Sequence, residues 1–303
     1  MNEKNKDVII IGAGKIAYSI VPALQKSGYN IAVIISRKIE SAKRLAGKFG
    51  TRHYSDKLGD IDIGGGIVFL CVPDNQIKAT TKELSKLKLR LSRFIFVHLS
   101  GALDISCLDS LQKGKGQTAS LHIMQTFPSK RRVPLIGCYA AVETDNKTAE
   151  KTLFDLAKDI SLKPFKLKSN TKTFYHLAGV FASNFLAGNL FAAETAFNKI
   201  GNINTNFFEM ISPIVFSTLA NIKKTGAVNA LSGPIERGDI QTIKKHLAVL
   251  KKDASKTNNN SLLFSYIAQS LKLLEVAEKK HGSHFTEKEK IKIVLKKEMR
   301  FIK

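Results

Sequence analysis

Short apolar runs alternate with amphipathic stretches through the first half of the chain. Runs rich in β-branched residues have the length of buried strands, and they occupy 7–14, 30–36, 66–74, 94–101 and 116–124. Apolar positions at helical spacing, ending in each case at a glycine, follow the first two runs at 15–28 and 38–50. Two more strands are predicted at 137–143 and 163–168, with a helix at 146–160 between them. This alternation predicts a mostly parallel sheet with helices on both faces.

After residue 169 the strand pattern stops and only helical periodicity remains. The predicted helices occupy 171–200, 204–224, 239–252, 260–281 and 286–300. We therefore predict an α/β chain in which a Rossmann-type parallel sheet over 1–168 precedes an all-helical domain over 169–303.

The composition is that of a globular protein without a membrane span. The 303 residues are 44% hydrophobic and 24% charged. The three cysteines have no CxxC or metal-ligand spacing, so no metal site is predicted and a reducing compartment is favoured. The apolar run near the N-terminus is too short for a signal peptide, and the longest weakly polar stretch, 176–197, includes polar residues such as His176, Asn189 and Glu194. These features predict a cytoplasmic protein.

The formal net charge of +23 raises the question of nucleic-acid binding. The cations are 39 lysines and 9 arginines, and they are dispersed along the whole chain. Readers of bases and phosphates concentrate arginine, because its planar fork makes bidentate contacts. Dispersed lysine is more typical of a solvated surface, so no specific nucleic-acid partner is predicted.

A glycine motif follows the first predicted strand. Gly12-Ala13-Gly14-Lys15-Ile16-Ala17 has the form GxGxxA and opens a predicted helix inside a strand–helix–strand unit. In such a turn the glycines allow a tight bend and close approach of the pyrophosphate, and the helix N-terminus attracts the phosphate charge. A purely structural glycine turn is the alternative. The motif predicts that Gly12, Gly14, Lys15 and Ile16 contact a dinucleotide.

The end of the second strand predicts which dinucleotide binds. NAD sites place an acidic residue there to accept a hydrogen bond from the ribose 2′-hydroxyl. This chain has Ser36, Arg37 and Lys38 instead. A hydroxyl donor beside a guanidinium suits a 2′-phosphate, so Ser36 and Arg37 predict a preference for NADP(H). The alternative is that the two cations only begin a solvated helix.

Several segments together resemble a known family. They are the glycine turn, "FLCVPDNQI" (69–77), "VHLSGA" (97–102), "SLHIMQTF" (120–127), "YHLAGVFASNF" (175–185) and "NALSGPIERGD" (229–239). In this order they resemble the bacterial Rossmann-like proteins with a C-terminal DUF2520 domain. That group is related to pyrroline-5-carboxylate reductase, ketopantoate reductase and 6-phosphogluconate dehydrogenase. The resemblance implies an NADP-binding domain, a helical domain that often dimerises, and therefore a homodimer, but no substrate.

Candidate site residues follow the later strands, because ligands of open α/β sheets bind at the carboxyl ends of the strands. Val72, Pro73, Ser100 and Gly101 are predicted to contact the cofactor, and His122 is a candidate acid or base. Each histidine of this region could also be an ordinary packed residue.

The first long helix carries the other candidates. His176 and Ser183 are seven residues apart and would share a helical face, with Asn184 beside it. Reductases of the related group carry polar catalytic residues on the corresponding helix, so the resemblance implies catalytic roles for His176 and Asn184. Ser183 and Arg237 are candidate substrate contacts, whereas Asp239 is better placed as a helix N-cap. The predicted activity is NADP(H)-dependent hydride transfer to or from a small carbonyl or imine compound. A non-catalytic NADP-binding sensor or scaffold is the alternative.

Overall fold

The fold is described by a computed structural model covering residues 6–61, 64–201 and 205–299. Contacts divide the chain into a first unit, Met1–Ser183, and a second unit, Asn184–Lys303. The last strand ends near the predicted boundary at 168, but the first unit continues through one more helix. Residues 204 and 300, where two predicted helices begin and end, lie outside the described ranges.

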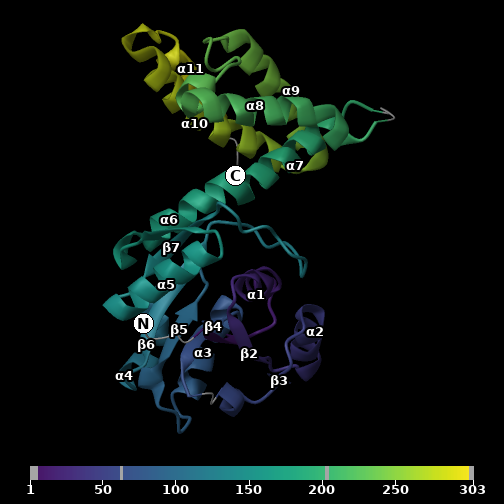
Figure 1. Cartoon of the computed structure of the whole chain (residues 1–303). Helices are drawn as coiled ribbons and strands as arrows, with labels where there is room; N and C mark the ends of the chain where they lie inside the picture. The colour runs from purple at the N-terminus through teal and green to yellow at the C-terminus, as the bar shows by residue number, and fades with distance from the viewer. Residues whose placement is uncertain (1–5, 62–63, 202–204, 300–303) are drawn as a thin grey trace. The chain divides into compact units, whose positions relative to one another are not determined.

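The first unit is built on one eight-stranded sheet, with the strand order β3-β2-β1-β4-β5-β6-β7-β8 (Figure 1). The strands are β1 (Asp7–Ile11), β2 (Asn30–Ile35), β3 (Tyr54–Ser55), β4 (Gly66–Leu70), β5 (Phe94–His98), β6 (Gln117–Ile123), β7 (Tyr139–Glu143) and β8 (Lys163–Lys166). Every ladder is parallel except β6–β7, so the predicted mostly parallel sheet is confirmed. The connection from β6 to β7 contains no helix among the described residues, so the chain does not cross back to the opposite end of the sheet. β7 therefore starts at the end where β6 stops, and the two strands are antiparallel.

Helices cover both faces of the sheet. Those of the first unit are α1 (Ala17–Lys26), α2 (Ile39–Phe49), α3 (Asp74–Leu84), α4 (Asp109–Lys113), α5 (Lys147–Asp159) and α6 (Lys172–Gly179). One buried cluster joins α1, α2 and α5 to one face, and a second joins α3 and α4 to the other. The strands are apolar on both faces for this reason, as expected for a covered parallel sheet.

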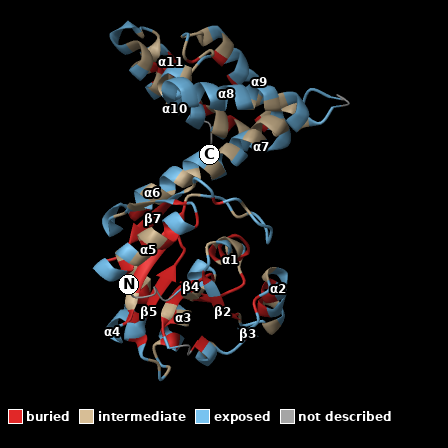
Figure 2. Cartoon of the chain, viewed as in Figure 1, coloured by how far each residue is buried: buried red, intermediate tan, exposed pale blue. Residues whose placement is uncertain are grey.

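The second unit is helical. Its helices are α7 (Phe185–Phe197), α8 (Phe207–Ala230), α9 (Ile240–Thr257), α10 (Ser261–His281) and α11 (Lys288–Met299). Its buried cluster is formed chiefly by α9, α10 and α11, whereas α7 and α8 have no buried residue in the described chain (Figure 2). Among the described residues, no helix combines the length and apolar character needed to cross a membrane. The predicted succession of an α/β sheet and an all-helical part is confirmed.

Candidate functional site

The glycine turn lies at the carboxyl end of β1, between the ends of β2 and β4. Gly12 has φ 104°, in the region that favours glycine. A Cβ at Gly12 would lie 2.5 Å from the carbonyl oxygen of Cys71, and one at Gly14 would lie 2.6 Å from the same atom. The backbone that follows β4 comes so close to both positions that neither has room for a side chain. Ala17, fully buried, begins α1.

The turn that precedes α1 offers backbone amides to an anion. Ile16 precedes the helix without a side-chain cap, and Lys15 beside it is exposed. The amides of residues 17–19 donate to the carbonyl oxygens three residues earlier, whereas the amides of residues 14–16 donate to no described residue. These amides lie at the positive end of the helix dipole. A pyrophosphate group would satisfy them, as the sequence predicts.

The end of β2 carries the two residues that predict NADP(H). Ser36 is half-buried, and its hydroxyl makes no hydrogen bond in the part of the chain that the structure describes. Arg37 is exposed and donates from Nη1 to Oε1 of Gln76 at 3.1 Å, which holds its guanidinium beside the first turn of α3. A hydroxyl and an oriented guanidinium thus lie at the position of the usual carboxylate.

The loops after β4 and β5 are tied to each other. Pro73 precedes α3 with an extended backbone, and Val72 lies partly buried before it. The hydroxyl of Ser100 donates to Asp74 at 2.6 Å and accepts from the amides of Ala102 and Leu103 at 3.2 and 3.0 Å. The Ser100 hydroxyl is thus engaged within the protein, and a cofactor contact there would come from the backbone of this loop.

Two histidines converge on Gly101, in the loop that follows β5. A Cβ at this buried glycine would lie 2.6 Å from Nε2 of His122 and 2.8 Å from Nδ1 of His176. The two rings are 6.2 Å apart between centroids, at 77° to one another. His122 comes from the end of β6 and His176 from α6. The structure thus brings together two of the three predicted catalytic residues.

Tyr175 holds the other side of the His122 ring. Its hydroxyl lies 3.1 Å from Nδ1 of His122, and the two rings meet edge to face. Burial lowers the pKa of His122 to about 4, with a smaller contribution from the charge of Lys172. Burial also raises the pKa of Tyr175 to about 12. At neutral pH His122 is therefore an uncharged imidazole and Tyr175 an uncharged phenol.

A buried ion pair lies beneath this cluster. Lys172, on α6, contacts Oε2 of Glu143 at 2.6 Å and donates to the hydroxyl of Ser120 at 2.5 Å. Oε1 of Glu143 accepts from the amide of Ile105 at 3.1 Å. Both charged side chains are only 2% exposed. Burial lowers the pKa of Lys172, and the hydrogen bond to Glu143 opposes that shift.

His98 lies in one row across the sheet with Ser120 and Glu143. The sheet register pairs His98 with Ser120, and Ser120 with Glu143, so these three side chains point to one face. His98 is fully buried, and neither ring nitrogen has a well-formed hydrogen bond to a described residue. Burial lowers its pKa to about 3, and the charge of Lys172 adds to the effect. His98 is uncharged at neutral pH.

The remaining candidates are placed as follows. A π-helical turn, Val180–Asn184, interrupts the regular helix after α6, so the α-helical spacing that would align Ser183 with His176 is not kept. Asn184 is the first residue of the second unit. Arg237 is exposed. Asp239 caps α9 through the amide of Thr242 at 3.0 Å, as its sequence position predicts.

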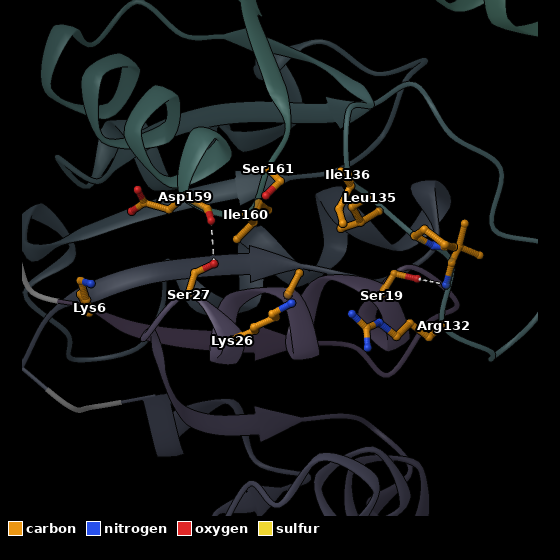
Figure 3. Close-up of a pocket in the computed structure, with 13 residues that line it drawn as sticks. Lys6, Ser19, Lys26, Ser27, Arg132, Leu135, Ile136, Asp159, Ile160 and Ser161 are labelled. Carbon is orange, nitrogen blue, oxygen red and sulfur yellow. Dashed lines mark hydrogen bonds between the residues drawn. The ribbon is translucent and has the colours of Figure 1, made fainter.

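A large cavity of the first unit lies elsewhere. About 790 Å³ in volume, it is bordered by α1, the 132–136 loop and the end of α5 (Figure 3). Lys26, Arg132 and Asp159 line it, but no predicted site residue does. Within the described residues, no group of three histidine, cysteine, aspartate or glutamate side chains could hold a metal ion.

Comparison with protein families agrees with this geometry. Residues 138–270 match a family described as a domain of unknown function, DUF2520. Residues 7–92 match the family described as NADP oxidoreductase coenzyme F420-dependent. The chain therefore combines an N-terminal match to an NADP oxidoreductase family with a later match to DUF2520. The resemblance seen in the sequence is confirmed, and the glycine turn with Arg37 lies in the oxidoreductase match.

Solved structures share the fold of this DUF2520 protein. A protein from Thermotoga maritima is 26% identical, with a TM-score of 0.67 over 90% of this chain and 99% of that one. A candidate NADP oxidoreductase from Bacteroides fragilis is 23% identical, with a TM-score of 0.68 over 85% and 95%. A reductive aminase from Aspergillus terreus, solved with NADPH and ethyl-5-oxohexanoate, is 13% identical, with a TM-score of 0.58 over 99% and 95%.

Curated relatives match only a small part of the DUF2520 protein. Glutamyl-tRNA reductase of Saccharolobus solfataricus is 39% identical over 62 residues, which is 20% of this chain and 15% of that enzyme. The chain therefore spans far less than two thirds of the curated relatives that it matches. The family and fold matches support an NADP-binding, oxidoreductase-like protein.

The site contains residues that the sequence analysis did not select. They are Asp74, Ser120, Glu143, Lys172 and Tyr175. Glu143 had a signal, because it is a single acid at the end of an apolar strand. Lys172 also had a signal, because it lies four residues before His176 and therefore shares a helical face with that predicted site residue.

Proposed function

We propose that this DUF2520 protein is an NADP(H)-dependent oxidoreductase that acts on a small carbonyl or imine compound. The observation that carries the proposal is the convergence of His122 Nε2 and His176 Nδ1 on Gly101. This point lies at the carboxyl edge of the sheet that also carries the glycine turn. Dinucleotides bind at that edge in open α/β sheets.

The residues of the edge fit an NADP(H) molecule. The free amides before α1 suit the pyrophosphate, and Ser36 with Arg37 suits the 2′-phosphate. When bound, the nicotinamide supplies or accepts the hydride, and the protein supplies binding and orientation. His122 and His176 provide polar nitrogens that can bind the substrate atom next to the reacting carbon. Lys172 ties α6, which carries His176, to Ser120 of β6, the strand that carries His122, and to Glu143 of β7.

Cofactor preference is tested first, by fluorescence titration of the full chain with NADPH and NADH at equal ionic strength. We expect NADPH to bind at least about tenfold more tightly, the gain from one charge-assisted contact. Tighter NADH binding would refute the preference.

Catalysis is tested by following NADPH absorbance with panels of small ketones, keto acids and preformed imines. Replacing His122 with Asn should lower turnover about a hundredfold or more, as for loss of a positioned proton donor or acceptor. Binding of NADPH without turnover of any of these compounds would favour the sensor or scaffold function. Full turnover by both His122→Asn and His176→Asn would remove these residues from the mechanism.

We also propose that the second unit mediates homodimerisation. Large apolar side chains of α7 and α8 are exposed, including Phe191, Ile214 and Phe216. Exposed large apolar side chains in such number on two helices are typical of an interface. Sedimentation should report a dimer, and Phe216→Glu should shift it toward monomer. A monomeric wild-type chain at micromolar concentration would refute this.

A further inference from the structure

The hydrogen bond between Tyr175 and His122 has a chemical consequence for the proposed reaction. His122 has two ring nitrogens with different surroundings. Nδ1 faces the hydroxyl of Tyr175 at 3.1 Å, and Nε2 faces Gly101. A neutral imidazole carries one proton, so one nitrogen donates and the other accepts. The partner of one nitrogen therefore decides what the other can do.

We propose that Tyr175 is a positioning residue that donates to Nδ1 of His122, so that His122 presents an uncharged Nε2–H donor above Gly101 to a carbonyl oxygen. The inference rests on the proposed oxidoreductase function and narrows its substrate class. A carbonyl oxygen has lone pairs that accept from Nε2–H. An iminium nitrogen has none, so this donor offers it nothing.

The direction of the bond follows from the chemistry of the two groups. A phenol is a good donor, and an imidazole nitrogen is a better acceptor than a phenol oxygen. The hydroxyl of Tyr175 also lies 3.4 Å from the carbonyl oxygen of His122, but a phenol has a single proton, and the shorter contact, 3.1 Å to Nδ1, is the better hydrogen bond. Burial raises the pKa of Tyr175 to about 12, so its proton is retained at neutral pH.

Packing holds Tyr175 in place independently of the hydroxyl. Its ring meets His122 edge to face at 5.3 Å and Phe165 at 5.7 Å between centroids. Phe165 comes from β8, which anchors this contact to the sheet. Replacing Tyr175 with Phe would therefore remove the hydroxyl and keep both ring contacts.

Five charged or titratable groups surround the His122 ring, and their combined effect with burial favours its neutral form. They are Lys172, Tyr175 and His176 on α6, Asp74 at the start of α3 and His98 on β5. The charges of Lys172 and His176 act in the same direction as burial, and Asp74 alone opposes them. A neutral donor that polarises a carbonyl needs no charge to form at the moment of reaction.

The chain provides a matched control far along the sequence. In the second unit, Nδ1 of His246 lies 3.0 Å from the hydroxyl of Tyr266, with ring centroids 5.6 Å apart and planes at 86°. This pair has nearly the same geometry as His122 and Tyr175, but both of its residues belong to the second unit. Tyr266→Phe therefore reproduces the chemical change without touching His122.

The experiment is nitrogen-15 NMR of the histidine rings in the ligand-free full chain, with His122 assigned by the loss of its signals in His122→Gln. We expect wild-type His122 to be neutral and protonated at Nε2 from pH 6 to 8. Tyr175→Phe should produce a mixture of tautomers at His122, whereas Tyr266→Phe should change only His246. A proton on Nδ1 of wild-type His122, or an imidazolium at pH 7, would overturn the proposal.

Kinetics separate this inference from the proposed function. We expect ketones to be reduced without an added amine, and Tyr175→Phe to lower kcat about tenfold with KM changed less than about twofold. Turnover that requires an amine would overturn the carbonyl assignment. An Nε2–H signal with no turnover of any compound would support the tautomer and refute the oxidoreductase function.

Discussion

The buried pair of Lys172 and Glu143 makes a quantitative prediction about stability. Lys172→Met would remove the ammonium and leave the carboxylate of Glu143 buried, with the amide of Ile105 as a remaining partner. Breaking one side of a buried ion pair destabilises a protein by about 3–5 kcal/mol, because an uncompensated charge stays in the interior. We expect a loss in this range.

The double variant Lys172→Met/Glu143→Gln should be far less affected. Glutamine keeps an oxygen that can accept from Ile105 and removes the isolated charge, so we expect a loss of only about 1–2 kcal/mol. The double variant should therefore be more stable than Lys172→Met alone. This reversal is the signature of a desolvated pair, since independent sites would show added losses.

The assay is urea unfolding followed by circular dichroism, with Lys166→Met as the control. Lys166 contacts Glu150 at 2.5 Å, almost the same distance, but its side chain is 60% exposed. A solvent-exposed pair contributes about 0–1 kcal/mol. If Lys172→Met and Lys166→Met lower the unfolding free energy equally, the assignment of Lys172 to a buried pair is wrong.

Four further predictions concern the cofactor site, the histidine cluster, acid stability and a helix cap. Arg37→Ala should weaken NADPH binding about tenfold to a hundredfold and NADH binding little, because one charge-assisted contact is worth about 1.5–3 kcal/mol; equal losses in a fluorescence titration would contradict this. Gly101→Ala would place a methyl group 2.6 Å from Nε2 of His122, and such overpacking lowers stability by about 1–3 kcal/mol. Unchanged thermal unfolding and unchanged ring signals would count against the convergence. The lowered pKa of His122, about 4 against 6.5 unfolded, means that the unfolded chain binds the proton more tightly. The contribution of neutral His122 to the free energy of unfolding is complete above pH 6.5. It is lost as the pH falls toward 4, by on the order of 3 kcal/mol. Urea unfolding of His122→Asn should show a smaller fall over that range, and an equal fall would refute the assignment. Asp239→Ala should cost about 1 kcal/mol by removing the cap of α9, whereas an unchanged urea midpoint would show that the cap adds nothing.

The sequence predicts the sheet well because its strands are apolar on both faces. β1, β2, β4 and β5 are apolar runs whose residues are mostly buried, and the glycine turn follows the first of them. The direction of β7 is a tertiary feature, since it depends on where the connecting chain returns. The helix α3 was not predicted, although Ile77, Thr81 and Leu84 form its buried stripe at helical spacing.

The sequence predicts the cofactor-binding residues of the candidate site but not its buried ion pair. Gly12, Gly14 and Arg37 belong to a motif whose spacing carries the chemistry. Lys172 is one of 39 lysines, and only its burial against Glu143 distinguishes it from a surface residue. The π-helical turn after α6 is equally hidden, because nothing in "VFASN" departs from an ordinary apolar helix.

Charge is distributed unequally along the carboxyl edge of the sheet. The end near β2 carries the exposed cation Arg37, suited to a phosphate. The end near β5 and β6 combines two uncharged histidines, His98 and His122, with a lysine neutralised by Glu143. A cofactor with three phosphates and a neutral reacting carbonyl would meet cations at one end and polar but uncharged groups at the other. The buried pair of Lys172 and Glu143 lowers stability less than a lone buried ion would. Its hydrogen bonds connect α6, β6 and β7 without adding net charge beside the reacting atoms. An iminium nitrogen could not accept from Nε2–H of His122, and the carboxylate of Asp74 nearby already accepts from Ser100, which is the physical reason to test ketones before iminium compounds.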